Sequence, residues 1–291
     1  MKCFYFTAAL HWDRYFKKEV SRIKFLFWNV YKKNLIAPLL QVILENDIDI
    51  VALAETENLD IQGVIHSLAL QSQDWKVLKI YPESDIRVLT RMYKHISVHR
   101  EDKRFASYKI FDGKEIFLLH VVHLASPMHL EECARDLRAV NISQVLRKIE
   151  DGIFSGSEYK SIVVGDFNLQ PYSQGIASIH GFNATMSIPI AKKIFRKAEG
   201  EPKLFYFNPT WKLMGDNKTA QGTYYNSSDQ QDKSIFWYAF DELLIRPYFI
   251  DRFNWEYFGI VEKTESYQFV SREMIDKSNY SDHLPIKFEI V

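Results

Sequence analysis

Four short stretches of the sequence place a residue that can bind a cation or a phosphate at the end of an apolar run. The stretch SIVVGDFN, at 161–168, shows the pattern most clearly, since its apolar run stops at a glycine and is followed by an acid, an aromatic and an amide. Runs of this kind are typical of buried strands, and functional side chains are often found where such strands end. The residues at the four ends are Asn29, Glu55, Asp166 with Asn168, and Asp282 with His283. Together the four ends predict a single site.

The elements around the first two ends predict how they are brought together. A strand is expected over Ile23 to Val30, a helix over Leu35 to Asn46 and a second strand over Ile48 to Ala54. A right-handed crossover between the two strands places Asn29 and Glu55 at the same end of neighbouring strands.

An alternative to Glu55 remains, because Glu57 lies two residues further on and the period of a strand puts both side chains on one face. After these residues, a helix is expected over Asp60 to Leu70, and strands over Trp75 to Tyr81, Asp85 to Met92 and His95 to His99.

The stretch Glu115 to Leu124 reads as a long apolar strand with two histidines three residues apart. That spacing puts His120 and His123 on opposite faces, so they are not expected to act together. His123 is the functional candidate, because the strand ends there. Leu130 to Ile149 follows as an amphipathic helix, and Arg135 and Arg138 are expected on its solvated face.

Two later segments have alternative interpretations. Ile190 to Ala198 is predicted as a helix that carries four basic residues, either as a solvated face or as a contact to a phosphate backbone. Phe205 to Tyr238 is rich in aromatic residues, which suit core and rim packing and also stacking on nucleobases. The four basic residues, and candidate substrate contacts, are Lys192, Lys193, Arg196 and Lys197.

The composition favours one large domain. The chain has 291 residues, of which 47% are hydrophobic, and Lys+Arg equals Asp+Glu at 37 each, so no overall positive charge indicates nucleic acid. Cys3 and Cys133 are far apart and have no Cys or His nearby at the spacing of a metal site, which favours free thiols and a cytoplasmic location. No segment approaches the length of a membrane span or the pattern of a signal peptide. We expect an N-terminal extension at 1–22 and a domain at 23–291.

Five blocks of the sequence, in order, resemble the endonuclease/exonuclease/phosphatase superfamily, whose members include DNase I-like nucleases, inositol polyphosphate 5-phosphatases and neutral sphingomyelinases. The blocks are FWN at 27–29, LAE at 53–55, VHL at 122–124, GDFN at 165–168 and SDH at 281–283. A sixth, FDELLI, matches the family's acidic strand with Asp241, although Ala239 stands where an Arg is often found. The resemblance covers 23–291 and implies a four-layer α/β/β/α sandwich of two mostly antiparallel sheets with helices outside.

The resemblance also implies roles for the site residues in phosphoester hydrolysis. It makes Glu55 the principal ligand of Mg²⁺ or Mn²⁺, assisted by Asn29 and Asp282, and oxygen ligands of this kind suit Mg²⁺. The implied catalytic residues are Asp166, which orients or deprotonates water; Asn168, which holds water or phosphate; His123 and His283, which bind phosphate oxygens; and Asp241, which pairs with His283.

Departures from the family leave the substrate open. The Arg that DNase I-like members place after the glutamate is replaced by Thr56, and either Thr210 or Thr223 supplies the threonine that some members place before Asp241. We expect a metal-dependent nuclease or phosphodiesterase acting on nucleic acid. The alternatives are a phosphatase or phosphodiesterase for a small molecule or lipid headgroup, and a binding domain without activity, against which the complete set of site residues argues.

Overall fold

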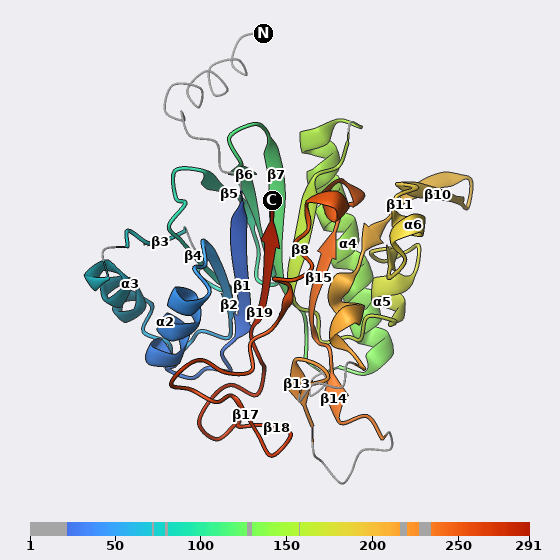
Figure 1. Ribbon diagram of the computed structural model, residues 1–291. Helices are drawn as coiled ribbons and strands as arrows, with labels where there is room; N and C mark the ends of the chain where they lie inside the picture. The colour runs from blue at the N-terminus through green and yellow to red at the C-terminus, as the bar shows by residue number, and fades with distance from the viewer. Residues whose placement is uncertain are drawn as a thin grey trace.

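The computed structural model describes residues 22–71, 73–78, 81–126, 130–156, 158–215, 220–226 and 234–291. Within these residues two large sheets stand side by side and helices cover their outer sides (Figure 1). This is the predicted four-layer α/β/β/α sandwich. The expected extension lies outside the described residues apart from Arg22, as does Cys3, so the division at residue 22 stays a prediction.

The two sheets contain six and seven strands in the described part of the chain. The first has the order β16 (Gly259–Ile260), β19 (Ile286–Ile290), β1 (Ile23–Asn29), β2 (Ile50–Ala54), β4 (Arg87–Thr90) and β3 (Lys76–Val77). The second has the order β5 (Ile96–Glu101), β6 (Phe105–Phe111), β7 (Ile116–His123), β8 (Ser161–Asp166), β15 (Asp241–Ile245), β12 (Tyr206–Phe207) and β9 (Ala184–Thr185).

Smaller elements surround these sheets. Three two-stranded hairpins are formed by β10 (Phe195–Ala198) with β11 (Glu201–Leu204), β13 (Tyr224–Tyr225) with β14 (Trp237–Tyr238), and β17 (Val270–Ser271) with β18 (Met274–Ile275). The α-helices are α2 (Ile36–Glu45), α3 (Ile61–Leu70), α4 (Glu132–Phe154), α5 (Gln174–Ala177) and α6 (Ile188–Ala191), with 3₁₀ turns η1 (Pro209–Leu213) and η2 (Pro247–Arg252). None of the helices so described is long and apolar enough to cross a membrane.

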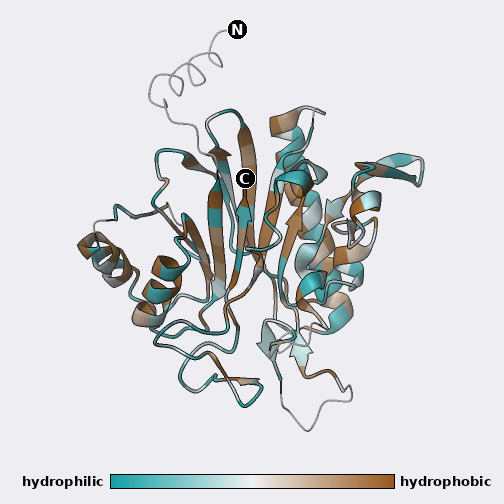
Figure 2. Ribbon diagram, viewed as in Figure 1, coloured by the Kyte–Doolittle hydropathy of each residue, from teal (hydrophilic) through white to brown (hydrophobic). Residues whose placement is uncertain are grey.

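Alternation along the strands divides their side chains between three cores. In β1, Phe25 and Phe27 pack between the two sheets, while Leu26 and Trp28 pack under α2 and α3. Phe25 stacks on Phe288 of β19 with ring centroids 4.5 Å apart. Figure 2 shows the hydrophobic residues concentrated along these central strands. The strands are buried on both faces, which explains why they read as nearly continuous apolar runs.

Strand directions bring all the predicted functional ends to one edge. Strands β1 and β2 are parallel with Asn29 opposite Ala54, and β7 and β8 are parallel with His123 opposite Asp166. Strand β15 is antiparallel to β8 and begins with Asp241 opposite Asp166, and β19 is antiparallel to β1. The ends of β1, β2, β7 and β8 therefore meet the beginnings of β15 and β19.

Two predictions about helices are wrong in part. The predicted helix over 190–198 ends at Ala191, and the residues from Phe195 pair with β11 around a turn in which Glu199 and Gly200 both have positive φ, 55° and 80°. Such a turn suits the twist of a two-residue hairpin, and the strand pairing overrides the helical spacing. The helix predicted over Leu130 to Ile149 is present as α4, but it begins at Glu132 and continues to Phe154.

Candidate active site

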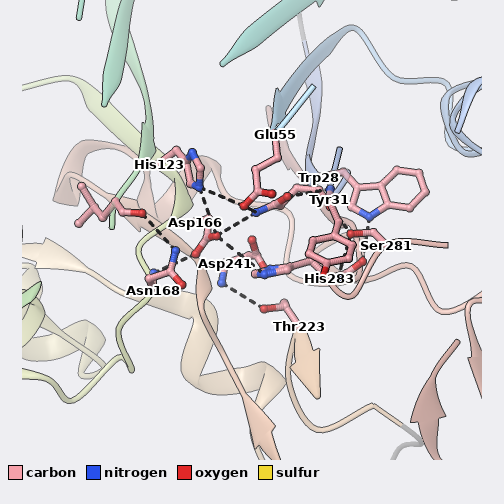
Figure 3. Close-up of polar contacts among 12 residues, drawn as sticks. Trp28, Tyr31, Glu55, His123, Asp166, Asn168, Thr223, Asp241, Ser281 and His283 are labelled. Carbon is pink, nitrogen blue, oxygen red and sulfur yellow. Dashed lines mark hydrogen bonds and ion pairs between the residues drawn. The ribbon is translucent and has the colours of Figure 1, made fainter. Parts of the chain in front are cut away.

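Six polar side chains from six strand ends converge at the shared edge of the sheets (Figure 3). All except Glu55 are buried, and hydrogen bonds or ion pairs connect each of them to another member. They are Asn29, Glu55, His123, Asp166, Asp241 and His283. The structure thus brings together residues that lie up to about 250 positions apart in the chain.

His283 lies between two buried carboxylates. Its Nδ1 donates to Oδ2 of Asp241 at 2.7 Å, and its Nε2 lies 3.9 Å from Oδ2 of Asp166. Burial opposes the charge on the ring, but Asp241 and Asp166 outweigh it and raise the pKa of His283 to about 10. Burial, together with the neighbouring Asp241, raises the pKa of Asp166 despite the opposing charge of His283. The site thus holds an imidazolium beside a carboxylate that can take up a proton.

His123 is the second cationic ring. Its Nδ1 bonds to Oδ2 of Asp85 at 3.2 Å, and its Nε2 lies 3.5 Å from Oε1 of Glu55. Burial opposes protonation, but these two acids raise the pKa of His123 to about 9. Asp85 was not among the predicted residues. It precedes β4 in a stretch without a motif, so only the folded chain reveals its position beside His123.

Asn29 links the two carboxylates on either side of it. Its Nδ2 donates to Oε1 of Glu55 at 3.2 Å and to Oδ2 of Asp166 at 3.0 Å, while its Oδ1 accepts from the backbone N–H of Tyr31 at 3.0 Å. The amide oxygen is therefore occupied in this arrangement, and the role of Asn29 as a metal ligand stays a prediction.

The choice between the two neighbouring glutamates is decided by position. Burial opposes ionisation of Glu55, but hydrogen bonds from His123 and Asn29 lower its pKa, so it is a carboxylate at neutral pH. Glu57 instead pairs with Lys32 at 3.1 Å on the surface. Glu55 itself has a positive φ of 52°, and this left-handed residue ends the alternation that had placed the two glutamates on one face.

Asn168 is held by three different contacts. Its backbone N–H donates to Oδ1 of Asp166 at 2.9 Å, and its side-chain amide donates to the carbonyl of Leu124 at 3.2 Å. Nη1 of Arg135 donates to its carbonyl oxygen. The expectation of a solvated Arg135 is therefore wrong: this side chain is half-buried, because the first turns of α4 run past the residues that follow β8.

The oxygen-rich side of the site fits a divalent cation. Oδ1 of Asp282 is buried and has no hydrogen-bond partner among the described residues, as is also true of Oδ1 of Asp241. Burial raises the pKa of Asp282, and the negative charge of Glu55 contributes to this. A cation between two carboxylates would relieve that repulsion and supply the missing partner. A second group of possible ligand atoms, from Asp166, Asp241 and His283, lies within 4.8 Å of one another. In this group Nδ1 of His283 is already hydrogen-bonded to Asp241.

Neighbouring side chains hold the backbone of the site residues in place through hydrogen bonds. Oγ of Ser281 donates to the carbonyl of Asn29 at 2.6 Å and accepts from the N–H of His283 at 3.0 Å, and Nε1 of Trp28 donates to the carbonyl of His283 at 2.9 Å. Oγ1 of Thr223 accepts from the N–H of Asp241 at 3.1 Å. Thr210 instead accepts from Leu243, so of the two threonines left open by the sequence, Thr223 lies beside the acid.

Aromatic side chains adjoin His283. The ring of Tyr224 lies 5.0 Å from the imidazole and stacks on Phe240 at 5.2 Å. Burial and the nearby Asp282 raise the pKa of Tyr224 to about 12. Tyr31 is 45% exposed and points its side chain toward the same part of the site (Figure 3). The aromatic segment predicted for the core or for stacking thus reaches the site through β13.

The four predicted basic contacts are not part of this cluster. They lie between α6 and β10, in the hairpin that projects from the upper right of Figure 1, whereas the site lies at the lower ends of β1 and β8. Lys192 forms an ion pair with Asp251 at 2.5 Å. A part in substrate binding by these residues stays a prediction.

Comparisons with known proteins give a match in structure. No protein-family model matches the chain, and no curated protein matches it. An endonuclease/exonuclease/phosphatase family protein from Bacteroides thetaiotaomicron has 12% identity and a TM-score of 0.54 over 92% of this chain and 97% of its own. D. rerio TDP2 complexed with single strand DNA product has 15% identity and a TM-score of 0.51 over 93% and 99%. The mannosyl-6-phosphatase Bt3783 from Bacteroides thetaiotaomicron has 14% identity and a TM-score of 0.53 over 92% and 99%.

These similarities agree with the two packed sheets and the outer helices of this chain (Figure 1). The chain therefore has the fold of the endonuclease/exonuclease/phosphatase, or DNase I-like, superfamily.

Proposed function

We propose that this chain is a divalent-metal-dependent phosphoester hydrolase that cleaves phosphodiesters of nucleic acid. The observation that carries the proposal is the convergence of two protonated histidines on Asp166, beside a second group of carboxylates with an unpartnered oxygen. The first arrangement suits proton transfer and stabilisation of negative charge on a phosphate. The second suits a cation with oxygen ligands.

Each residue has a defined part in the proposed reaction. Asp166 accepts the proton of the attacking water, since its raised pKa makes it a better base than an ordinary aspartate. His123 and His283 donate to the phosphate oxygens as charge develops. Asn168 orients water or phosphate. Glu55 and Asp282, with Asn29, are the residues that would hold Mg²⁺ or Mn²⁺, which would act as a Lewis acid and as a template.

Aromatic side chains support a nucleic acid substrate. Tyr31 and Tyr224 adjoin the catalytic residues and offer ring faces for nucleobases. The similar D. rerio TDP2 was solved with a single strand DNA product. A small phosphoester is the second candidate, because the two lysines that follow β1 are engaged elsewhere: Lys32 pairs with Glu57, and Lys33 donates to the carbonyls of Lys277, Ser278 and Tyr280.

The test compares hydrolysis of labelled single- and double-stranded DNA, RNA and a bis-aryl phosphodiester in Mg²⁺, Mn²⁺ and EDTA. We expect metal-dependent cleavage that falls by about 10²-fold or more in Glu55→Gln, because one carboxylate ligand is lost. Glu57→Gln is the matched control, and it should keep full activity. His283→Ala should be as inactive as Glu55→Gln.

Two results would contradict the proposal. Cleavage that persists in EDTA would show that the reaction needs no divalent metal. Equal losses of activity in the Glu55 and Glu57 variants would show that Glu55 is not the metal ligand. If only the bis-aryl ester is cleaved, the substrate is a small phosphoester and the proposal of a nucleic acid substrate is wrong. Its cleavage should also respond less to salt than that of DNA or RNA.

A further inference from the structure

A projection remote from the candidate active site exposes a group of large apolar side chains. The projection comprises residues 186–205, which run from the turn before α6 through the β10–β11 hairpin (Figure 1). Residues 192–197 are all exposed. Within the projection Met186 is 62% exposed, Ile194 52% and Phe195 45%. Ile194 and Phe195 are consecutive in the chain, and exposed apolar side chains that form a contiguous patch mark binding regions.

The same projection is basic in a chain whose net charge is zero. It contains five Lys and Arg residues and two glutamates. The glutamates are engaged, Glu201 with Lys203 at 3.2 Å and Glu199 with His180 at 3.5 Å. No carboxylate of the described residues forms an ion pair with the three remaining cations, which are Lys193, Arg196 and Lys197. The projection therefore has positive charge that nothing in the described chain neutralises.

Two of these cations face a cavity of about 390 Å³. Lys193 and Arg196 line it together with Ile190, Phe205 and small residues of β9. On the hairpin, Arg196 is directly opposite Lys203, but Lys203 is already paired with Glu201. A negatively charged group in the cavity would instead be attracted by Lys193 and Arg196, which form no ion pair among the described residues.

The backbone presents Ile194 to solvent in an unfavourable conformation. Its φ is 70°, a left-handed value that β-branched residues rarely adopt. The conformation is held by the N–H of Ile194, which donates to Ala191, and by its carbonyl, which accepts from Phe205. An asparagine or glycine would suit this position better, so the fold alone does not explain an isoleucine here.

We propose that this projection binds an anionic phospholipid surface. Ile194 and Phe195 would enter the interfacial layer, while Lys193, Arg196 and Lys197 would face lipid phosphates, and the cavity would hold one headgroup. Apolar side chains combined with basic ones are what such surfaces attract. Nucleic acid fits less well, because Phe195 is the one ring among the exposed large apolar side chains of this fully described projection, and Met186, Ile190 and Ile194 offer none for a base. An acidic peptide fits less well, because its charges alone would leave Ile194 and Phe195 without an apolar layer to enter.

This inference goes beyond the proposed hydrolase and does not depend on it. The candidate active site lies at the other end of the central strands (Figure 1), so a lipid bound at the projection is a surface ligand and not the substrate. Glu55→Gln should consequently abolish hydrolysis and leave lipid binding unchanged.

The test is sedimentation of the full chain with vesicles of phosphatidylcholine alone and with about one third phosphatidylserine. We expect binding to the anionic vesicles that weakens with salt. Phe195→Ser and Ile194→Asn should each lower the affinity about tenfold, because each removes an apolar side chain that would be buried in the lipid layer on binding. Lys193→Gln with Lys197→Gln should lower it about thirtyfold. Ile194→Asn should also raise the Tm, since asparagine accepts the positive φ.

Matched controls lie outside the projection. Leu70→Asn removes an apolar side chain that is 71% exposed, and Lys94→Gln with Lys263→Gln removes two exposed cations; these variants should bind as the wild type does. The proposal is overturned by equal binding to neutral vesicles, by no binding, or by unchanged affinity in Ile194→Asn and Phe195→Ser. It is also overturned if the basic residues support binding to oligonucleotides or acidic peptides but not to vesicles.

Discussion

Two imidazole rings carry positive charge in this site for the same physical reason. Each is buried, which alone would favour the neutral ring, and each lies between two carboxylates that reverse this preference. Asp241 and Asp85 occupy equivalent positions, since each bonds to Nδ1 and leaves Nε2 directed toward the centre of the site. A phosphate at the centre would therefore meet donors from two sides.

A change at Asp241 tests the charge on His283. Asp241→Asn keeps an oxygen near Nδ1 but removes the negative charge, so the pKa of His283 should fall from about 10. If the cation is the active form, kcat should fall by about 10²- to 10⁴-fold. The basic limb of the kcat/KM profile should move to lower pH, because the ring loses its proton earlier as pH rises.

The measurement is the pH profile of phosphodiester cleavage, with Asp251→Asn as control. Asp251 is an exposed acid paired with Lys192, and its loss should leave the profile in place. An unchanged basic limb in Asp241→Asn would show that the charge of His283 does not limit the reaction.

At the scale of elements, the close pairing of β7 with β8 positions Asp166, the proposed general base. A Cβ on Gly165 would lie 1.9 Å from the carbonyl oxygen of Val122. This is backbone that cannot move without separating the two strands. Because His123 and Asp166 are paired in the same register, any separation would also displace the ends that carry them.

Gly165→Ala should therefore lower both stability and activity. We expect a fall of about 2 to 4 kcal/mol in the free energy of unfolding, measured by urea denaturation. Gly152→Ala is the matched control, because nothing lies within 4 Å of its added Cβ in α4. That variant should gain about 0.5 to 1 kcal/mol. A stable and active Gly165→Ala would mean that the strands tolerate the separation.

At the scale of the whole molecule, a buried polar group connects the second sheet to α4. Glu150 of α4 bonds to the guanidinium of Arg246 at 2.5 Å and accepts from Tyr206 at 2.9 Å. His120 is buried nearby and its Nδ1 lies 2.7 Å from Oγ of Ser107. Burial lowers the pKa of His120 to about 4, although Glu150 opposes this. The ring is therefore neutral in the folded chain.

This neutral ring predicts how the fold responds to acid. The unfolded chain takes up the proton near pH 6.5 and the folded chain only near 4, so stability is present above 6.5 and is lost as pH falls between these values. The loss from this group should be roughly 3 kcal/mol. His120→Asn should remove that part of the pH dependence, as measured by urea denaturation at pH 7.5 and 4.5.

His66→Asn provides the comparison, since His66 is exposed on α3. It should lose as much stability as the wild type does between the two pH values. If His120→Asn loses just as much, the buried ring is not a source of acid sensitivity.

The sequence by itself predicted the sandwich, through its resemblance to a known superfamily, and most of the residues that meet at the candidate active site. Strands buried on both faces, such as β1 and β8, must be apolar throughout, so their ends appear in the sequence as abrupt changes to polar residues. Local patterns therefore predicted that Asn29, Glu55 and Asp166 lie at strand ends. They also predicted that His123 and His120 lie on opposite faces of their strand, because the period of a strand is two residues.

Only the tertiary structure decided which side chains meet. Asp85 lies in a stretch without a motif, and Arg135 was expected on the solvated face of its helix. They reach His123 and Asn168 through packing between distant elements. The basic stretch after Ile190 was expected to be a helix, since spacing alone does not reveal that β11 pairs with it. Periodicity is a property of neighbouring residues, whereas contacts between strand ends depend on how the whole chain closes.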